Sequence, residues 1–251
     1  MTKLSRRVFL GSAPVAAAAA GIFGTFFSTA AEAAIKWDET YNVIVIGAGG
    51  AGLSAAISAK EAGAKKVVVL EKMMFAGGNT IRAGGGFNAA IKADYEKAGI
   101  TDSPKLHAEQ TLAAGDGRGD PVLVHQLTEK APESVQWLKD HDVKFQDHIY
   151  QIYGGLYKRA RNPIGPRGGA YIKALLEVCK KEDIPILYST RVVEIIREHQ
   201  LSGRVLGVKV EQKDGKTLYL RATNAVVAAA GGFAANDRLT AISDPRMGQL
   251  G

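Results

Sequence analysis

The stretch from Tyr41 to Glu71 constrains the fold more than any other part of this 251-residue chain. A β-branched run, Val43 to Ile46, predicts a strand buried on both faces of a parallel sheet. The turn after it has the pattern G-x-G-x-x-G, and the alanine-rich segment 54–62 predicts a helix directly after that turn. A second apolar run, 67–70, predicts a neighbouring strand. This order indicates a βαβ unit of a Rossmann-like α/β domain.

The glycines of this turn each have a role in binding a dinucleotide. Gly47 allows the tight turn, Gly49 lets the backbone approach the pyrophosphate, and Gly52 lets the helix pack close to the strand. The start of the helix, at Ala51, would present free N–H groups to the phosphates. Glu71 would accept hydrogen bonds from a ribose, and its charge would repel a 2′-phosphate, which disfavours NADP. The alternative is a tightly packed turn without a ligand.

The loop after Glu71 favours FAD over NAD. In NAD-binding domains the second strand usually leads into another helix, whereas here it leads into a glycine-rich loop at 72–90. Asn79 and Thr80 supply short polar side chains, and the glycines at 84–86 offer bare backbone. Because glycine is entropically costly in a folded chain, close approach to a flat isoalloxazine ring explains this run better than chance.

Several motifs of the chain together resemble one known family. The segments GAGGAGLSAA, LEK, GGNT and AGGGFNAA resemble the FAD-binding domain of the fumarate reductase and succinate dehydrogenase flavoprotein superfamily. The likeness is strongest to periplasmic flavocytochrome c fumarate reductases and urocanate reductases, and 3-oxosteroid dehydrogenases are further relatives. Segments 120–145, 189–210 and 224–236 continue the likeness downstream.

The resemblance implies a fold and a set of cofactor contacts. The fold is α/β, a Rossmann-like FAD-binding domain with a central parallel sheet and an added β-meander. Val193 would contact the adenine, and Ala230 with Gly231 would end a strand that returns to the cofactor. The expected FAD-binding residues are Gly47, Gly49, Ala51, Gly52, Glu71, Lys72, Gly78, Asn79, Thr80, Gly84, Gly85, Val193, Ala230 and Gly231.

The resemblance also implies a reaction. It is hydride transfer by the flavin to or from a CH–CH or C=C bond, with fumarate the first expected substrate and urocanate or another unsaturated acid next. A separate cytochrome or quinol oxidase would be the electron donor. Two alternatives stay open: a 3-oxosteroid dehydrogenase-like enzyme, and a non-catalytic module that binds FAD or transfers electrons.

The catalytic residues of the family lie in a part that this sequence does not show. The substrate-binding histidines and the proton-delivering arginine come from a capping domain and from the segment that follows it. We therefore expect residues 34–251 to be an incomplete FAD-binding domain without the capping domain and inactive alone, with catalytic residues beyond residue 251. A complete short protein is the alternative.

Residues 1–33 have the features of a twin-arginine export signal. The basic start contains Ser5-Arg6-Arg7-Val8-Phe9-Leu10, an apolar run follows at 11–27, and Ala31-Glu32-Ala33 offers a cleavage site. These features predict recognition by the twin-arginine translocase and a periplasmic location. An uncleaved membrane anchor is the alternative.

Composition excludes several functions. The net charge of +7 forms no basic stripe, so we expect no nucleic-acid binding. The single cysteine, Cys179, excludes an internal disulfide and a CxxCH haem site. The five histidines lack metal-binding spacing, so no metal site is expected.

Four further segments carry structural predictions. Residues 167–181 predict an amphipathic helix with Cys179 on its core face, and Pro132 is expected to break or restart a helix between 122 and 141. Residues 203–220 predict two strands joined at Asp214-Gly215, and 225–230 a buried strand. The basic segment 157–169, with Lys158, Arg159, Arg161 and Arg167, is either an anion contact or a solvated loop.

Overall fold

The computed structural model describes residues 35–234, 236–244 and 246. The predicted export signal, residues 1–33, lies outside this part of the chain. Within it, no helix combines the length and the apolar character that crossing a membrane requires.

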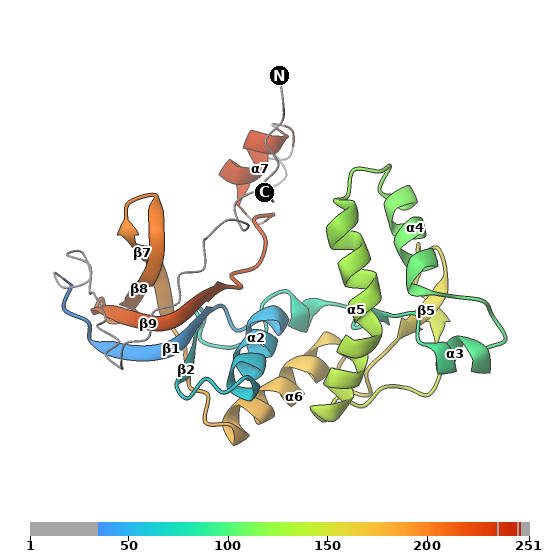
Figure 1. The fold of residues 1–251 in the computed structure, drawn as a ribbon, viewed down its shortest axis with the longest axis horizontal. Helices are drawn as coiled ribbons and strands as arrows, with labels where there is room; N and C mark the ends of the chain where they lie inside the picture. The colour runs from blue at the N-terminus through green and yellow to red at the C-terminus, as the bar shows by residue number, and fades with distance from the viewer. Residues whose placement is uncertain (1–34, 235, 245, 247–251) are drawn as a thin grey trace, which may run out of the picture.

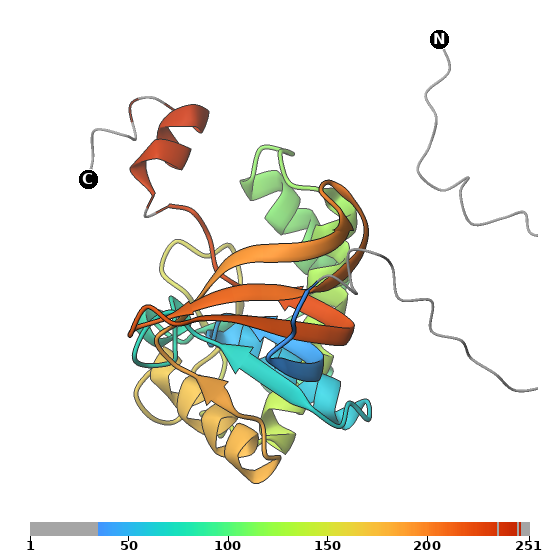
Figure 2. The same cartoon turned by 90° about the vertical axis from the view of Figure 1, so that its left-hand side faces the viewer.

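A six-stranded sheet organises the fold, and its strand order is β6-β2-β1-β9-β8-β7 (Figure 1). The first four of these strands run parallel to one another, and β8 and β7 join them in antiparallel pairing. The strands are β1 (Glu39–Ile46), β2 (Val67–Leu70), β6 (Ile186–Leu187), β7 (Thr190–His199), β8 (Ser202–Gln212) and β9 (Thr217–Ala228). The predicted parallel sheet with an added meander is confirmed, and Figure 2 shows the long meander strands in orange and red beside β1.

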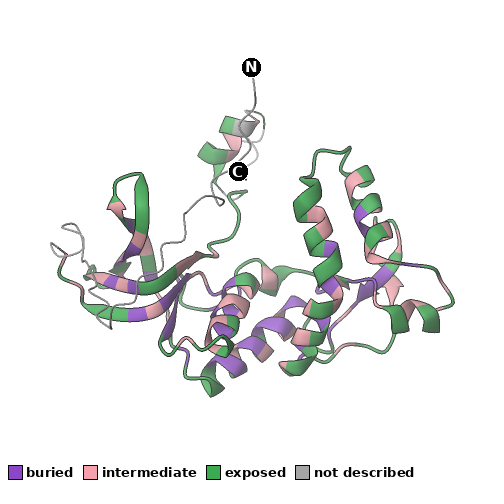
Figure 3. Ribbon diagram, in the orientation of Figure 1, coloured by how far each residue is buried: buried purple, intermediate pink, exposed green. Residues whose placement is uncertain are grey.

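Strand β1 is buried on both faces because two layers cover it. Side chains alternate along a strand, so Val43 and Val45 pack beneath the helices α2 (Gly50–Glu61) and α6 (Gly168–Lys181). Ile44, between them, packs against the meander on the opposite face. Each such fully buried side chain contributes about 1.5–3 kcal/mol. Figure 3 shows the buried residues concentrated in this part of the molecule.

A second lobe follows the glycine-rich loop. It contains a short sheet of order β3-β5-β4 and three helices, on the right in Figure 1. The elements from the loop onward are η2 (Thr80–Arg82), β3 (Phe87–Asn88), α3 (Lys92–Lys97), α4 (Pro104–Ala114), α5 (Pro121–Asp140), β4 (Tyr150–Gln151) and β5 (Lys158–Arg161), and α7 (Asp237–Ser243) follows β9.

Two predictions about local structure are confirmed. The turn between β8 and β9 contains Gly215 at φ 83° and Asp214, whose carboxylate accepts a hydrogen bond from the Lys216 N–H at 3.0 Å. Helix α6 buries Leu175 and Cys179 as its periodicity predicts. Burial raises the pKa of the Cys179 thiol to about 11, so this cysteine is an unreactive core residue.

The prediction that Pro132 breaks its helix is wrong. Helix α5 runs without interruption through Pro132. An interior proline removes one helical hydrogen bond and costs about 3 kcal/mol. Here the residues on either side, Ala131 and Val135, are buried against Ala89, and Leu138 reaches the main core. Tertiary packing therefore holds the helix together across the proline.

The prediction of a buried strand at 225–230 is confirmed for the strand but not for its burial. Residues 225–228 form the end of β9, residues 229 and 230 lie beyond it, and Ala225 and Ala228 are exposed. Strand β8 pairs only with residues 217–221 of β9, so the second half of β9 has a described neighbour only in β1. It is a sheet edge, and an apolar composition alone does not distinguish an edge from a centre.

Candidate functional site

Two of the three glycines in the turn after β1 are required by the chain itself. Gly47 has φ 103°, and a Cβ on it would lie 2.5 Å from the Ala229 oxygen. A Cβ on Gly52 would lie 1.8 Å from the Gly47 oxygen, so only glycine lets α2 approach the turn. A Cβ on Gly49, in contrast, would meet nothing described closer than 3.9 Å. The backbone at Gly49 therefore borders open space, as a ligand would require.

The N-terminus of α2 has free donors beside this space. The first intrahelical bond runs from the Leu53 N–H to the Gly49 oxygen at 3.0 Å. The Gly50 N–H donates to Thr80 Oγ1 at 3.1 Å. The N–H groups of Ala51 and Gly52 precede the first intrahelical donor and have no helical acceptor. With no acidic side chain in the first turn, the partial positive charge of the helix is available to an anion.

The carboxylate of Glu71 lies at the same turn, and the residue is 7% exposed. Its Oε2 accepts a hydrogen bond from the Ala48 N–H at 2.8 Å, and its Oε1 accepts one from the Met73 N–H at 2.9 Å. Each carboxylate oxygen can accept two such bonds, so one position on each oxygen remains for a ribose hydroxyl. The sequence had indicated only the ribose contact. The structure adds a second role, in which Glu71 fixes the glycine turn and the start of the following loop.

The glycine-rich loop returns to the N-terminus of α2. The Gly77 N–H donates to the Ala48 oxygen at 2.9 Å, and a Cβ on Gly78 would lie 3.5 Å from the Gly49 Cα. Thr80 contacts α2 through the bond to Gly50 described above, and Asn79, beside it, is exposed. The structure thus brings Gly78, Asn79 and Thr80 to the predicted diphosphate position.

The glycines at 84–86 have more than one explanation. A Cβ on Gly84 would meet nothing described within 4 Å. A Cβ on Gly85, which has φ 86°, would lie 2.8 Å from the backbone carbon of Arg167, and one on Gly86 would lie 2.8 Å from the Tyr150 hydroxyl. Packing against the backbone therefore requires Gly85, whatever ligand the loop contacts, whereas a Cβ on Gly86 would meet only the ends of side chains, which can move. Packing within the chain explains Gly85, and the flat-ring argument from sequence remains for Gly84 and Gly86.

The remaining predicted contacts lie at the same edge of the sheet. The Thr190 N–H at the start of β7 donates to the Glu71 backbone oxygen at 2.9 Å, and Val193, three residues on, is 40% exposed. The Ala229 N–H donates to the Ile46 oxygen at the end of β1 at 2.9 Å, and the next two residues, Ala230 and Gly231, are exposed. Lys72 is exposed beside Glu71. Ligands of open α/β sheets bind at the carboxyl ends of the parallel strands, where these residues gather.

At its two central arginines, the basic segment is neither a contact for a ligand anion nor a solvated loop. Residues 158–161 form β5, and Arg159 and Arg161 are 4% and 3% exposed. Arg159 binds the Asp102 carboxylate through two hydrogen bonds of 2.8 and 3.0 Å. Arg161 lies 2.6 Å from the Asp94 carboxylate. Both charges are neutralised inside the second lobe, and no sequence spacing identified their partners.

Tyr171 was not among the residues predicted from sequence. This residue is buried on α6, and its hydroxyl donates to the Gly85 oxygen at 2.7 Å. The positions Tyr171, Leu175 and Val178 follow the helical period, so the apolar pattern could have placed Tyr171 on the core face. The pattern could not have shown that its hydroxyl contacts the glycine-rich loop.

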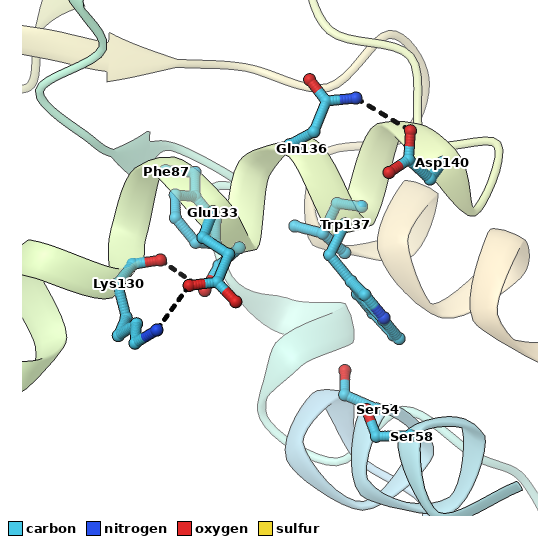
Figure 4. A pocket seen from close by; sticks show the side chains of 10 residues that line it. Ser54, Ser58, Phe87, Lys130, Glu133, Gln136, Trp137 and Asp140 are labelled. Atoms are coloured by element: carbon cyan, nitrogen blue, oxygen red, sulfur yellow. Dashed lines mark hydrogen bonds and ion pairs between the residues drawn. The ribbon is translucent and has the colours of Figure 1, made fainter. Parts of the chain in front are cut away.

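A separate pocket of about 570 Å³ lies between α2 and α5 (Figure 4). Trp137 and Phe87 form its apolar part, and its charged side chains pair locally, Lys130 with Glu133 at 2.6 Å. None of the predicted FAD-binding residues lines it. Among the described residues, no group of three or more His, Cys, Asp or Glu side chains is placed to hold a metal ion.

Comparison with known proteins gives consistent matches. The model of the family described as the FAD binding domain matches residues 42–249. The chain is 37% identical over 211 residues to the fumarate reductase (cytochrome) of Shewanella frigidimarina, covering 83% of this chain and 36% of that protein. It is 34% identical over 208 residues to the urocanate reductase of Eggerthella lenta, covering 82% of this chain and 34% of that protein.

Solved structures agree with the sequence matches. The open conformation of a flavocytochrome c3 fumarate reductase superposes with a TM-score of 0.78 at 31% identity, covering 85% of this chain and 37% of that chain. The chain spans roughly a third of the length of the curated relatives it matches.

Proposed function

Since the chain belongs to the FAD binding domain family, and FAD is accordingly its cofactor, we propose that it is the FAD-binding portion of a flavoprotein reductase acting on carbon–carbon double bonds. The family match confirms the resemblance found in the sequence. The relatives are named for the reduction of fumarate and urocanate, both small unsaturated carboxylic acids. We propose the same substrate class here, with fumarate first, and a separate cytochrome or quinol oxidase as electron donor.

One observation indicates which atoms of the chain would contact the cofactor. Gly49 borders open space, whereas Gly47 and Gly52 are packed against the chain. The N–H groups of Ala51 and Gly52 have no helical acceptor. A diphosphate needs this combination of bare backbone and convergent donors. In the proposed arrangement Ala51 and Gly52 hold the diphosphate, and Glu71 accepts from the ribose.

The other contacts follow from the position of the loop. Val193 would contact the adenine, and Lys72, Ala230 and Gly231 would border the cofactor along the sheet edge. Bound FAD supplies a ring that accepts and donates a hydride, and the protein contributes its position and its electrostatic surroundings. The loop residues that would contact the ring are Gly78, Asn79, Thr80, Gly84 and Gly85.

Two measurements test the proposal, the FAD content of the purified protein and its turnover with different acceptors. We expect a yellow protein that releases one FAD per chain on denaturation. Oxidation of reduced viologen with fumarate, urocanate, acrylate or a 3-oxosteroid as acceptor then distinguishes the substrate classes. Because the 251-residue chain is proposed as the FAD-binding portion only, it should itself be yellow without turnover, and the turnover assay uses the whole protein that contains this portion. Yellow whole protein without turnover on any acceptor supports the non-catalytic module instead, and a colourless protein without FAD contradicts the assignment.

We further propose that residues 1–33 direct export by the twin-arginine route and that the FAD-binding domain spans 34–251. Replacing Arg6 and Arg7 by lysine should keep the protein in the cytoplasmic fraction, whereas replacing Lys3 by arginine should leave export intact. Export of the double variant at the normal rate would contradict this route.

A further inference from the structure

The hydroxyl of Tyr171 fixes one peptide group of the glycine-rich loop. It donates to the Gly85 oxygen at 2.7 Å, and the residue is only 8% exposed. The ring packs against Phe145 with centroids 6.0 Å apart, which restricts its motion. Burial raises the pKa of Tyr171 above its ordinary value, so the hydroxyl keeps its proton and can donate at neutral pH.

The start of α6 holds the same loop through its backbone. The Gly168 N–H donates to the Ala83 oxygen at 3.2 Å. A Cβ on Gly85 would lie 2.8 Å from the Arg167 carbonyl carbon, so Gly85 is packed directly against the first turn of the helix. Two independent contacts, one with backbone and one with the Tyr171 side chain, therefore determine the orientation of Gly85.

This orientation determines where the next N–H group points. The described part of the chain has no cis peptide bond, and in a trans peptide the C=O and the following N–H point to opposite sides. The Gly85 carbonyl points inward to Tyr171, so the Gly86 N–H points outward. Gly85 is buried and Gly86 is exposed, and no described group accepts a hydrogen bond from the Gly86 N–H.

The loop that contains Gly86 also borders the N-terminus of α2, where the cofactor is proposed to bind. The loop is attached to that helix by the bond from the Gly50 N–H to Thr80 Oγ1 and by the bond from the Gly77 N–H to the Ala48 oxygen. Its other face is occupied by the start of α6. A flat ring extending from the α2 N-terminus along this loop would have to lie on a face that α6 leaves free, and we take this to be the side of the exposed Gly86 N–H.

We propose that Tyr171 is a positioning residue that holds the Gly86 N–H toward the flavin ring and thereby raises the reduction potential of bound FAD. A fixed N–H donor stabilises the negative charge that the ring gains on reduction, and it needs no reorganisation when that charge appears. The inference rests on the proposed function, because it requires FAD at the N-terminus of α2.

The test compares two tyrosine variants of the full chain loaded with FAD. Tyr171→Phe should lower the equilibrium constant for flavin reduction about tenfold, a shift of about −30 mV for a two-electron couple in a titration against a reference dye. Tyr157→Phe is the matched control, because the Tyr157 hydroxyl also donates to a backbone oxygen, that of Thr101, in another loop. An unchanged potential in Tyr171→Phe, or equal shifts in both variants, would overturn the inference.

Hydrogen exchange on the unmodified chain gives a second test, which does not depend on folding of a variant. The Gly86 amide should exchange more slowly when FAD is bound than when it is removed. Bound FAD with an unchanged Gly86 exchange rate overturns the role of this peptide and leaves the proposed function intact. A chain that binds no FAD overturns the proposed function itself.

Discussion

The β1–α2–β2 unit and the second lobe, built from α3, α4, α5 and the β3-β5-β4 sheet, are fixed by different interactions. In the first, bare backbone and β-branched side chains decide the geometry, and one decisive contact, between Gly47 and Gly52, lies within the turn itself. In the second lobe, buried charged side chains decide the geometry, and Arg159 binds Asp102, which lies 57 positions away in the sequence. Local backbone geometry can be inferred from sequence, whereas a distant charge partner cannot.

The largest expected effect belongs to the second lobe. Arg159→Met should lower the free energy of unfolding by about 3–5 kcal/mol, because it leaves the Asp102 carboxylate buried without its partner. Urea unfolding monitored by circular dichroism measures this change. The double variant Arg159→Met, Asp102→Leu should recover most of the loss, since no unpaired charge remains. If the double variant is as unstable as the single one, the charge pairing is not what fixes this lobe.

A backbone clash should give the next largest effect, in the β1–α2–β2 unit. Gly52→Ala places a methyl group 1.8 Å from the Gly47 oxygen, and a backbone atom can move only with the whole turn. We expect a loss of about 3 kcal/mol in unfolding free energy, the upper part of the range for overpacking. Thermal and urea unfolding of the FAD-free chain would show it. Wild-type stability in this variant would mean that α2 does not lie so close to the turn.

The variant Gly49→Ala should separate binding from folding in the same turn. Gly49 has φ −81° and a new Cβ would meet no described atom closer than 3.9 Å, so the folding cost should be only that of alanine in place of glycine at the N-cap of α2, about 1 kcal/mol or less. The methyl group would occupy the space proposed for the diphosphate, so the Kd for FAD should rise about tenfold or more, about 1.4 kcal/mol. Gly115→Ala, at the end of α4, is the control for both measurements. Unchanged FAD affinity in Gly49→Ala would contradict the proposed diphosphate position.

The smallest expected effect is the reaction of the Cys179 thiol in the native chain. Its raised pKa, about 11, means that the folded chain holds almost no thiolate at pH 8, and its side chain is 1% exposed. A thiol reagent should leave the native chain unmodified at pH 8 and modify one thiol per chain in urea. Labelling should increase only as the pH approaches the raised pKa or as the chain unfolds. Rapid labelling of the native chain at pH 8 would show that α6 does not pack as described.

The sequence predicted the parts of the site that depend on spacing. The glycine turn, the parallel neighbour β2 and the position of Glu71 follow from periodicity and from the requirements of a dinucleotide. The second contact of Glu71, with the Met73 N–H, was not predictable, because it depends on how the loop folds back. The same is true of Tyr171, whose hydrogen bond crosses 86 positions.

Where prediction failed, tertiary context overrode a local rule. Pro132 lies inside α5 because Ala131 and Val135 are buried around it. Residues 225–228 form a strand as predicted, yet the pairing of β8 stops short of them and leaves them at an edge instead of buried. The basic segment was expected to contact a ligand anion or solvent, yet Arg161 is buried and pairs with Asp94 of the chain itself.

A crystal structure of the full chain with FAD would test the central claim most directly. We predict a diphosphate oxygen within about 3 Å of the Ala51 and Gly52 nitrogens, with a ribose hydroxyl at the Glu71 carboxylate. Electron density for FAD elsewhere on the chain, or a diphosphate that does not contact the N-terminus of α2, would contradict the proposed site.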